Sequence, residues 1–230
     1  MHTVYDNTKG EIMFLKRIVF IFKFLTRLLH VFWQIFYGVL RISKLKQPMV
    51  TIFGGSQLKK SDIYFIKAYE LAARFVANDI SVLTGGGPGV MEAANCGANH
   101  TENAPIRSIG IGVEGLTEKP NNCAQEYFVL HYFFARKWLL TRFSSAFIVF
   151  PGGFGTLDEL FEVLTLMQTE KMNPFPVVLF GVAYWTPLLD WIKSEPLARG
   201  LLHMKNMDLI IITDDIEEAF IYAKKECLTC

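Results

Sequence analysis

Residues 81–95 read SVLTGGGPGVMEAAN, and residues 146–159 read AFIVFPGGFGTLDE. Each stretch begins with a short apolar run, passes through a glycine-rich turn, and continues into a run with helical periodicity. A short apolar run bounded by glycines is typical of a buried strand. The two stretches therefore predict strand–glycine–helix units, which belong to a parallel sheet covered by helices on both faces.

The same alternation of strands and helices continues along the chain after residue 48. Strands are expected at 50–53, 81–83, 108–113, 128–130, 146–150, 177–180 and 209–213. Helices are expected at 61–78, 90–99, 134–143, 156–169, 185–194 and 216–226. The sequence thus predicts an α/β fold of the Rossmann-like type over residues 48–230, preceded by a helical extension over residues 1–47.

The composition of the 230-residue chain is that of a folded protein, since 51% of its residues are hydrophobic and 20% are charged. The formal net charge of +1 argues against nucleic-acid binding, which favours a strong basic surplus. The four cysteines, at positions 96, 123, 227 and 230, do not form the dense pattern of a disulfide-stabilised domain. We therefore expect a reducing compartment and a cytoplasmic location.

Residues 12–46 are basic and apolar, and they predict a long helix that is either continuous or divided near Gly38. At about 100° per residue, most of its polar side chains fall within a stripe about 60° wide. These side chains are Lys16, Lys23, Arg27, His30, Gln34 and Arg41. The longest part without Lys or Arg, Leu28–Leu40, is shorter than the ~20 residues of a transmembrane helix. We expect peripheral contact with the cytoplasmic face of a membrane or packing against another subunit, and the pattern favours neither.

Three of the expected strands end in glycine clusters, at 54–55, 85–87 and 152–155. Ligands of open parallel sheets bind beyond the carboxyl ends of the strands, and glycines and helix N-termini let backbone N–H groups approach an anion. Tight turns that need a positive φ would explain one cluster, but two strand–glycine–helix units favour a phosphate site. Neither cluster completes the P-loop or the dinucleotide G-x-G-x-x-G pattern, so a mononucleotide is the expected ligand.

The start of the expected helix 156–169 carries two polar side chains, Thr156 and Glu159. Thr156 is placed to meet a phosphate through its hydroxyl and N–H groups, and Glu159 follows one turn later. The alternative is a capping box, in which Glu159 only accepts a hydrogen bond from the N-cap backbone. Glu162 lies on the same edge of the helix, which would form a pair of carboxylates near the turn.

Two adjacent cations, Arg136 and Lys137, interrupt an otherwise apolar and aromatic run at residues 131–140. Such cations need either an anion or a solvent-facing position. A solvated face is the simpler interpretation for Lys137, whereas Arg136 is expected to face the ligand.

At these residues the sequence resembles the LOG family of cytokinin riboside 5′-monophosphate phosphoribohydrolases, formerly mislabelled lysine decarboxylases, and most of all its bacterial branch. The resemblance covers roughly residues 50–223. The motifs that carry it are FGGS at 53–56, GGGPGVMEAAN at 85–95, YFFARK at 132–137 and PGGFGTLDE at 151–159. The helical extension lies outside the resemblance.

The resemblance implies hydrolysis of the N-glycosidic bond of a nucleoside 5′-monophosphate, AMP or an N6-modified AMP, to free base and ribose 5-phosphate. Arg136 and Glu159 are implied to be the catalytic pair, without a metal or another cofactor. The implied substrate-binding residues are Gly54, Ser56, Gly86, Gly87, Lys137, Gly152, Gly153, Gly155, Thr156 and Glu162. The family also implies a homodimer or larger homo-oligomer. The alternatives are a nucleotide sensor without turnover and a membrane-recruited scaffold.

Overall fold

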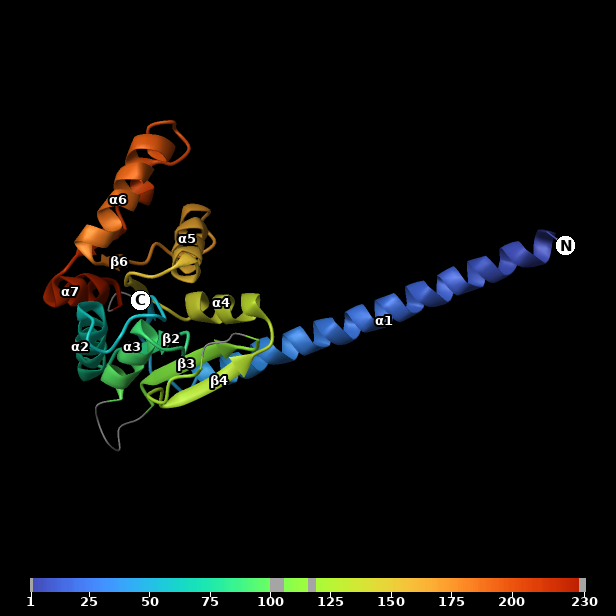
Figure 1. Cartoon of the computed structure of the whole chain (residues 1–230), viewed down its shortest axis with the longest axis horizontal. Coiled ribbons are helices and arrows are strands. Elements are labelled where there is room, and N and C mark those ends of the chain that lie inside the picture. Colours follow the sequence, from blue (N-terminus) through green and yellow to red (C-terminus); the bar gives the residue numbers. More distant parts are fainter. Residues whose placement is uncertain (1, 100–105, 116–118, 228–230) are drawn as a thin grey trace.

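The computed structural model describes residues 2–99, 106–115 and 119–227. Within them, one parallel sheet has the strand order β4-β3-β2-β1-β5-β6-β7. Its strands β2, β3 and β4 lie side by side in Figure 1. The strands are β1 (Met49–Phe53), β2 (Ser81–Thr84), β3 (Ser108–Val113), β4 (Glu126–Leu130), β5 (Ala146–Val149), β6 (Val177–Phe180) and β7 (Ile210–Thr213). All neighbouring strands pair in parallel, which confirms the predicted α/β class.

Helices cover both faces of this sheet, because successive side chains of a buried strand point to opposite faces and both faces are apolar. Ile52 of β1 packs with one set of helices and Phe53 with the other. The first set is α2 (Ile63–Ala77), α3 (Val90–Ala98) and α7 (Ile216–Cys227). The second is α4 (Phe133–Arg142), α5 (Phe154–Gln168), α6 (Val182–Ile192) and the end of α1 (His2–Ile42).

The order of the strands creates one switch point. The chain builds β1 to β4 in one direction and then returns to place β5 on the other side of β1. The carboxyl ends of β1 and β5 therefore diverge into connections on opposite sides of the sheet, which is where open α/β sheets bind their ligands. Two of the three predicted glycine clusters follow these two strands.

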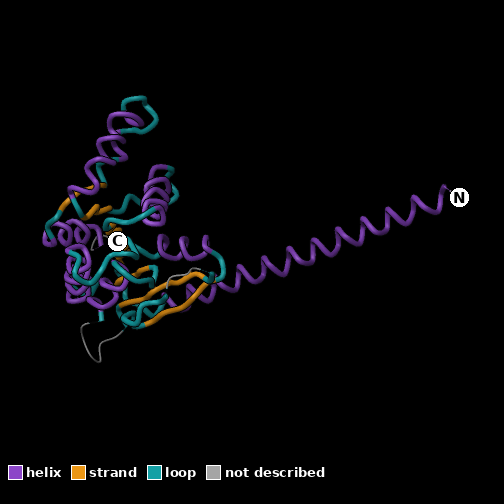
Figure 2. Tube along the Cα trace, in the orientation of Figure 1, coloured by secondary structure: helices purple, strands orange, loops and turns teal. Residues whose placement is uncertain are grey.

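The N-terminal helix differs from the prediction in its bounds. We expected a helix over 12–46, but α1 begins at His2, continues through Gly38 without a break, and ends at Ile42. Its last turns belong to the core, since Ile42 and the following Leu45 are buried against the sheet. Most of α1 projects from the domain as a single straight rod (Figure 2). By length and composition alone, its segment Met13–Ile42 would also suffice to cross a membrane.

Candidate active site

A cavity of about 300 Å³ lies at the carboxyl ends of β1 and β5, at the switch point. This volume is at the lower end of the range for small-molecule sites, about 300–1,000 Å³. The residues that line it are Gly54, Gly55, Ser56, Met91, Phe133, Arg136, Gly153, Gly155, Thr156 and Glu159. The fold thus brings together residues from most of the motifs that carry the family resemblance.

The N-terminus of α5 opens into this cavity. The N-cap residue is Gly153, and no side chain caps the helix. The backbone N–H groups of the first turn therefore have no partner within the helix and remain available to an anion. Because Thr156 is the third helical residue and not the N-cap, the capping-box alternative for Glu159 is wrong.

Gly153 and Gly155 leave space that no protein atom fills. A Cβ atom built on either residue would have no heavy atom within 4 Å, and neither residue has a positive φ. Neither packing nor backbone conformation therefore explains glycine at these two positions. Both residues are exposed at the N-terminus of α5 and line the cavity, so the backbone there is accessible from it.

Arg136 and Glu159 face each other across the cavity. The Arg136 Nη2 atom lies 3.6 Å from Glu159 Oε1, and the two side chains are only 8% and 12% exposed. Arg136 Nε donates to the carbonyl of Ile111 at 2.9 Å, which holds the guanidinium in place. Gly85 makes room for it, because a Cβ there would lie 1.9 Å from Arg136 Nη2. The cavity is thus lined by a carboxyl group and a guanidinium group that are largely shielded from solvent, and the guanidinium is held in place by hydrogen bonding.

Burial raises the pKa of the Glu159 carboxyl from 4.5 to about 7, although the positive charge of Arg136 opposes this shift. Desolvation disfavours the charged form of a carboxyl group, and the ion pair is too long to compensate fully. A pKa near 7 is suited to acid–base catalysis at neutral pH, because both protonation states are then populated. Perturbed groups of this kind are concentrated at functional sites.

The pKa of Glu159 predicts a pH-dependent stability. Between pH 4.5 and about 7 the unfolded chain releases this proton whereas the folded protein retains it, so the free energy of unfolding falls as pH rises through this window. The full shift corresponds to about 3 kcal/mol. The side-chain amide in the Glu159→Gln variant does not titrate, so the stability of this variant should not change with pH for this reason. The wild type should therefore lose stability relative to this variant as pH rises from 4.5 to about 7. Urea denaturation of both proteins between pH 4.5 and about 7 measures the difference in their free energies of unfolding. If this difference does not change with pH, the pKa of Glu159 is not raised.

Five of the predicted binding residues do not line this cavity, namely Lys137, Gly152, Glu162, Gly86 and Gly87. Lys137 Nζ pairs with Asp158 at 2.9 Å and with Glu162 at 2.7 Å. Lys137 is thus paired rather than simply solvated. Glu162 pairs with this lysine and also lies close enough to Glu159 for its negative charge to raise the pKa of that carboxyl. Gly152 supports the turn, since a Cβ there would lie 2.1 Å from Thr156 Oγ1.

Gly86 and Gly87 line a second, smaller cavity of about 20 Å³. Arg136 also lines it, so its guanidinium stands between the two spaces. Gly86 has φ +71°, a conformation that favours glycine. For this residue the tight-turn interpretation is therefore sufficient without a ligand.

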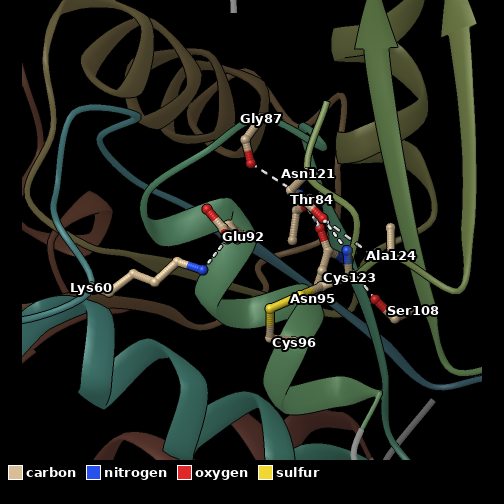
Figure 3. The surroundings of a disulfide bond; sticks show 10 residues. All are labelled: Lys60, Thr84, Gly87, Glu92, Asn95, Cys96, Ser108, Asn121, Cys123 and Ala124. Atoms are coloured by element: carbon tan, nitrogen blue, oxygen red, sulfur yellow. Dashed lines mark hydrogen bonds and ion pairs between the residues drawn. A yellow bond between two sulfur atoms is a disulfide. The ribbon is translucent and has the colours of Figure 1, made fainter. Parts of the chain in front are cut away.

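A buried polar network holds the glycine turn after β2 (Figure 3). The Thr84 hydroxyl donates to Asn95 Oδ1 at 2.7 Å, and Asn95 Nδ2 donates to the Ser108 hydroxyl at 2.7 Å. Asn121 Nδ2 donates to the carbonyl of Gly87 at 2.9 Å and to Asn95 Oδ1 at 3.0 Å. Asn95, which is fully buried, thus connects β2, β3 and the loop before β4.

Asn95→Ala should destabilise the protein by about 2–3 kcal/mol, because it leaves several buried polar groups without partners. Denaturation in urea measures this loss. Asn173→Ala is the matched control, since Asn173 is exposed and surface changes usually stay within about 0.5 kcal/mol. Equal stability of the two variants would contradict the role of the network.

The structure joins Cys96 and Cys123 in a disulfide, which the sequence analysis did not expect (Figure 3). The residues are 27 positions apart, and their Cα atoms lie 4.6 Å from each other. Cys96 follows Asn95 and Cys123 follows Asn121 closely, so the disulfide lies beside the polar network. The cysteines therefore do not support a reducing compartment, and the cytoplasmic location stays a prediction.

The sequence analysis missed three residues of the cavity lining, Gly55, Met91 and Phe133. Phe133 lies three residues before Arg136 on α4, and its ring centre is 5.7 Å from the guanidinium carbon. The helical spacing of an aromatic residue and the ligand-facing arginine was the signal that could have found it.

Fold and cavity together define a Rossmann-like α/β protein with a small-molecule-sized cavity at the switch point. Residues 91–223 match the family described as "Possible lysine decarboxylase". The probable cytokinin riboside 5′-monophosphate phosphoribohydrolase LOGL2 of Oryza sativa subsp. japonica is 32% identical over 179 residues, which are 74% of this chain and 69% of that protein. The chain belongs to this family, the LOG family.

Two further similarities extend the comparison. The cytokinin riboside 5′-monophosphate phosphoribohydrolase of Rhodococcoides fascians is 28% identical, over 74% of this chain and 86% of that protein. The solved molybdenum cofactor carrier protein of Chlamydomonas reinhardtii superposes with a TM-score of 0.56 at 24% identity, over 80% of this chain and 100% of that one. The latter similarity concerns the fold alone.

Proposed function

We propose that the protein hydrolyses the N-glycosidic bond of a nucleoside 5′-monophosphate to free base and ribose 5-phosphate. The observation that carries the proposal is the nearly dry Arg136–Glu159 pair beside a helix N-terminus with unpaired N–H groups. The names of the relatives support the same reaction class. AMP and N6-modified AMP are the expected substrates.

In this proposal the phosphate occupies the space above Gly153 and Gly155. The first-turn N–H groups of α5 bind its oxygens, and the helix dipole favours its negative charge. The Thr156 hydroxyl, which lines the same cavity, would add a further donor. Neutral nucleosides lack the group that this end of the cavity binds, so they should be poor substrates.

The reaction passes through an oxocarbenium-like ribosyl cation as the bond from C1′ to the base breaks and its electron pair leaves with the base. The Glu159 carboxylate stabilises this cation and accepts a proton from the water that forms the new bond to C1′. Arg136 holds substrate oxygens and keeps Glu159 in position. The proton is then returned to the departing base or to solvent.

A substrate screen tests the proposal. The purified protein is incubated separately with AMP, other nucleoside monophosphates and adenosine, and free base is measured by chromatography. Release of base from a monophosphate but not from adenosine is expected. Tight binding of a monophosphate without release of base would instead support the alternative, a nucleotide-binding protein without turnover.

We also propose that the catalytic domain forms a homodimer through α5 and α6. A largely apolar cavity of about 470 Å³ lies between these helices, lined by Phe161, Leu164, Thr165, Gln168, Leu188, Trp191, Ile192, Pro196, Leu201, Leu202, Met207 and Ile210. Trp191 is 55% exposed, and Phe154 beside the active site is 92% exposed. Exposed apolar patches of this kind are typical of interfaces.

Sedimentation of the full chain in mild detergent tests the dimer. The wild type should sediment as a dimer, and Trp191→Glu should shift it toward the monomer because a charge is then buried in the interface. A wild type that is monomeric at all concentrations would contradict the proposal.

A further inference from the structure

Most of α1 projects from the domain (Figure 2). This projecting part exposes many apolar side chains. Between residues 13 and 40, the exposed large hydrophobic residues are Met13, Phe14, Leu15, Ile18, Val19, Phe20, Ile21, Phe22, Phe24, Leu25, Leu28, Leu29, Phe32, Trp33, Phe36 and Leu40. An apolar surface of this length marks a site of interaction with a membrane or another protein.

The domain contacts α1 on its polar side and through the neighbouring apolar side chains Ile35, Val39 and Ile42. The amide oxygen of Gln34 accepts a hydrogen bond from the backbone N–H of His131 at 2.8 Å. Arg41 Nε donates to Glu126 at 2.9 Å. Facing away from these contacts, Phe36 is 44% exposed. Near the domain, the polar stripe of α1 therefore faces the domain and the aromatic side faces away from it.

The same polar side continues along the projecting part. At about 100° per residue, Lys16, Lys23 and Arg27 lie on the side of Gln34 and Arg41. Phe32 and Phe36 lie on the opposite side, and Trp33 lies at the edge between the two sides. If the apolar side of α1 rests on a flat surface, both the cations and the catalytic domain are above that surface.

The charges of this segment favour one kind of surface. The sequence contains no acidic residue between Glu11 and Asp62, whereas Lys16, Arg17 and Lys23 are all cationic. A second copy of α1 packed on the apolar side would therefore cover that side but offer these cations no acidic partner from this segment. Anionic lipid headgroups complement both the cations and the apolar side.

We propose that α1 lies flat in the surface of an anionic membrane, with its apolar side among the acyl chains and the catalytic domain on the aqueous side. Cations distributed along the whole stripe contact the headgroups through their long side chains. A spanning orientation would instead bury Lys23 and Arg27 in the hydrocarbon, which is costly.

Flotation of the full chain with vesicles tests this arrangement. The protein should bind vesicles of phosphatidylcholine and phosphatidylglycerol far more strongly than phosphatidylcholine alone, and high salt should release part of it. Binding should shift the tryptophan emission to shorter wavelength, and Trp33→Phe should remove most of this shift.

A charge-matched pair of variants isolates the stripe. Lys16→Gln/Lys23→Gln/Arg27→Gln should lower the partition coefficient on anionic vesicles about 100-fold, since each cation near such a surface contributes about 5-fold. The control Lys59→Gln/Lys171→Gln/Lys193→Gln removes the same charge from exposed positions on the domain and should bind like the wild type.

Three outcomes would overturn the proposal. If both triple variants lose vesicle binding equally, the binding depends on the net charge of the protein and not on α1. Resistance to high salt and alkaline carbonate, with release only by detergent, would mean that α1 spans the membrane. Failure to bind either vesicle, together with concentration-dependent self-association, would mean that a second copy covers the apolar side.

Discussion

Glu159→Gln should lower kcat by about 10²–10⁴-fold, the usual scale for the loss of a positioned acid–base group. Gln occupies nearly the same volume but cannot accept the proton of the attacking water or carry the charge that stabilises the ribosyl cation. Binding of the substrate should change little, because the phosphate is held elsewhere, at the N-terminus of α5. Steady-state kinetics with AMP measures both effects.

The control for this variant is Glu70→Gln, the same substitution on α2 at the opposite face of the sheet, where Glu70 pairs with Lys67. It should retain wild-type turnover. The wild type should also show kcat/KM rising with pH through about 7, because the ionised form of Glu159 is the active one. Turnover of Glu159→Gln close to that of the wild type would remove Glu159 from the mechanism.

Gly155→Ala should lower kcat/KM by about 10²–10³-fold without harming the fold. The added methyl group would enter the space proposed for the phosphate and disrupt two or more charge-assisted hydrogen bonds, each worth about 1.5–3 kcal/mol. Apart from its chain neighbours and the backbone of its own helix, no protein atom lies within 4 Å of this methyl position. Kinetics and the melting temperature are measured on the same preparation.

The melting temperature distinguishes a functional from a structural role of Gly155. Alanine is favoured over glycine within a helix by about 1 kcal/mol, so the variant should be as stable as the wild type or more stable. A variant with lower stability would mean that glycine is needed for the turn itself. Unchanged kcat/KM would mean that the phosphate binds elsewhere.

The sequence was sufficient to predict the α/β fold, because the local patterns of strand and helix agree with the sheet that these elements build together. The strands at 108–113 and 177–180 were predicted with the bounds that the structure has. Both are short and largely apolar, and they are bounded by charged residues in the first case and by proline and glycine in the second, so period and length leave little ambiguity. Helix starts were less accurate. α5 begins at Phe154 rather than Thr156, because Gly153 acts as the N-cap without a side-chain signal.

The candidate site was only partly predictable, because motifs specify which residues are near in sequence but not which pair in space. Arg136 lines the cavity, whereas the adjacent Lys137 does not and pairs with Asp158. The two side chains differ because successive helical residues point in different directions. The disulfide between Cys96 and Cys123 depends on the long-range contact between Asn95 and Asn121, which no local pattern encodes.

The central claim is tested most directly by the stoichiometry of products from AMP. With substrate in large excess over the protein, the account predicts equal molar amounts of adenine and ribose 5-phosphate, each far exceeding the amount of protein. In the Glu159→Gln variant, the formation of adenine and of ribose 5-phosphate should fall to the same extent. Release of inorganic phosphate and adenosine, or no product at all from any nucleoside monophosphate, would contradict the proposed N-glycosidic hydrolysis.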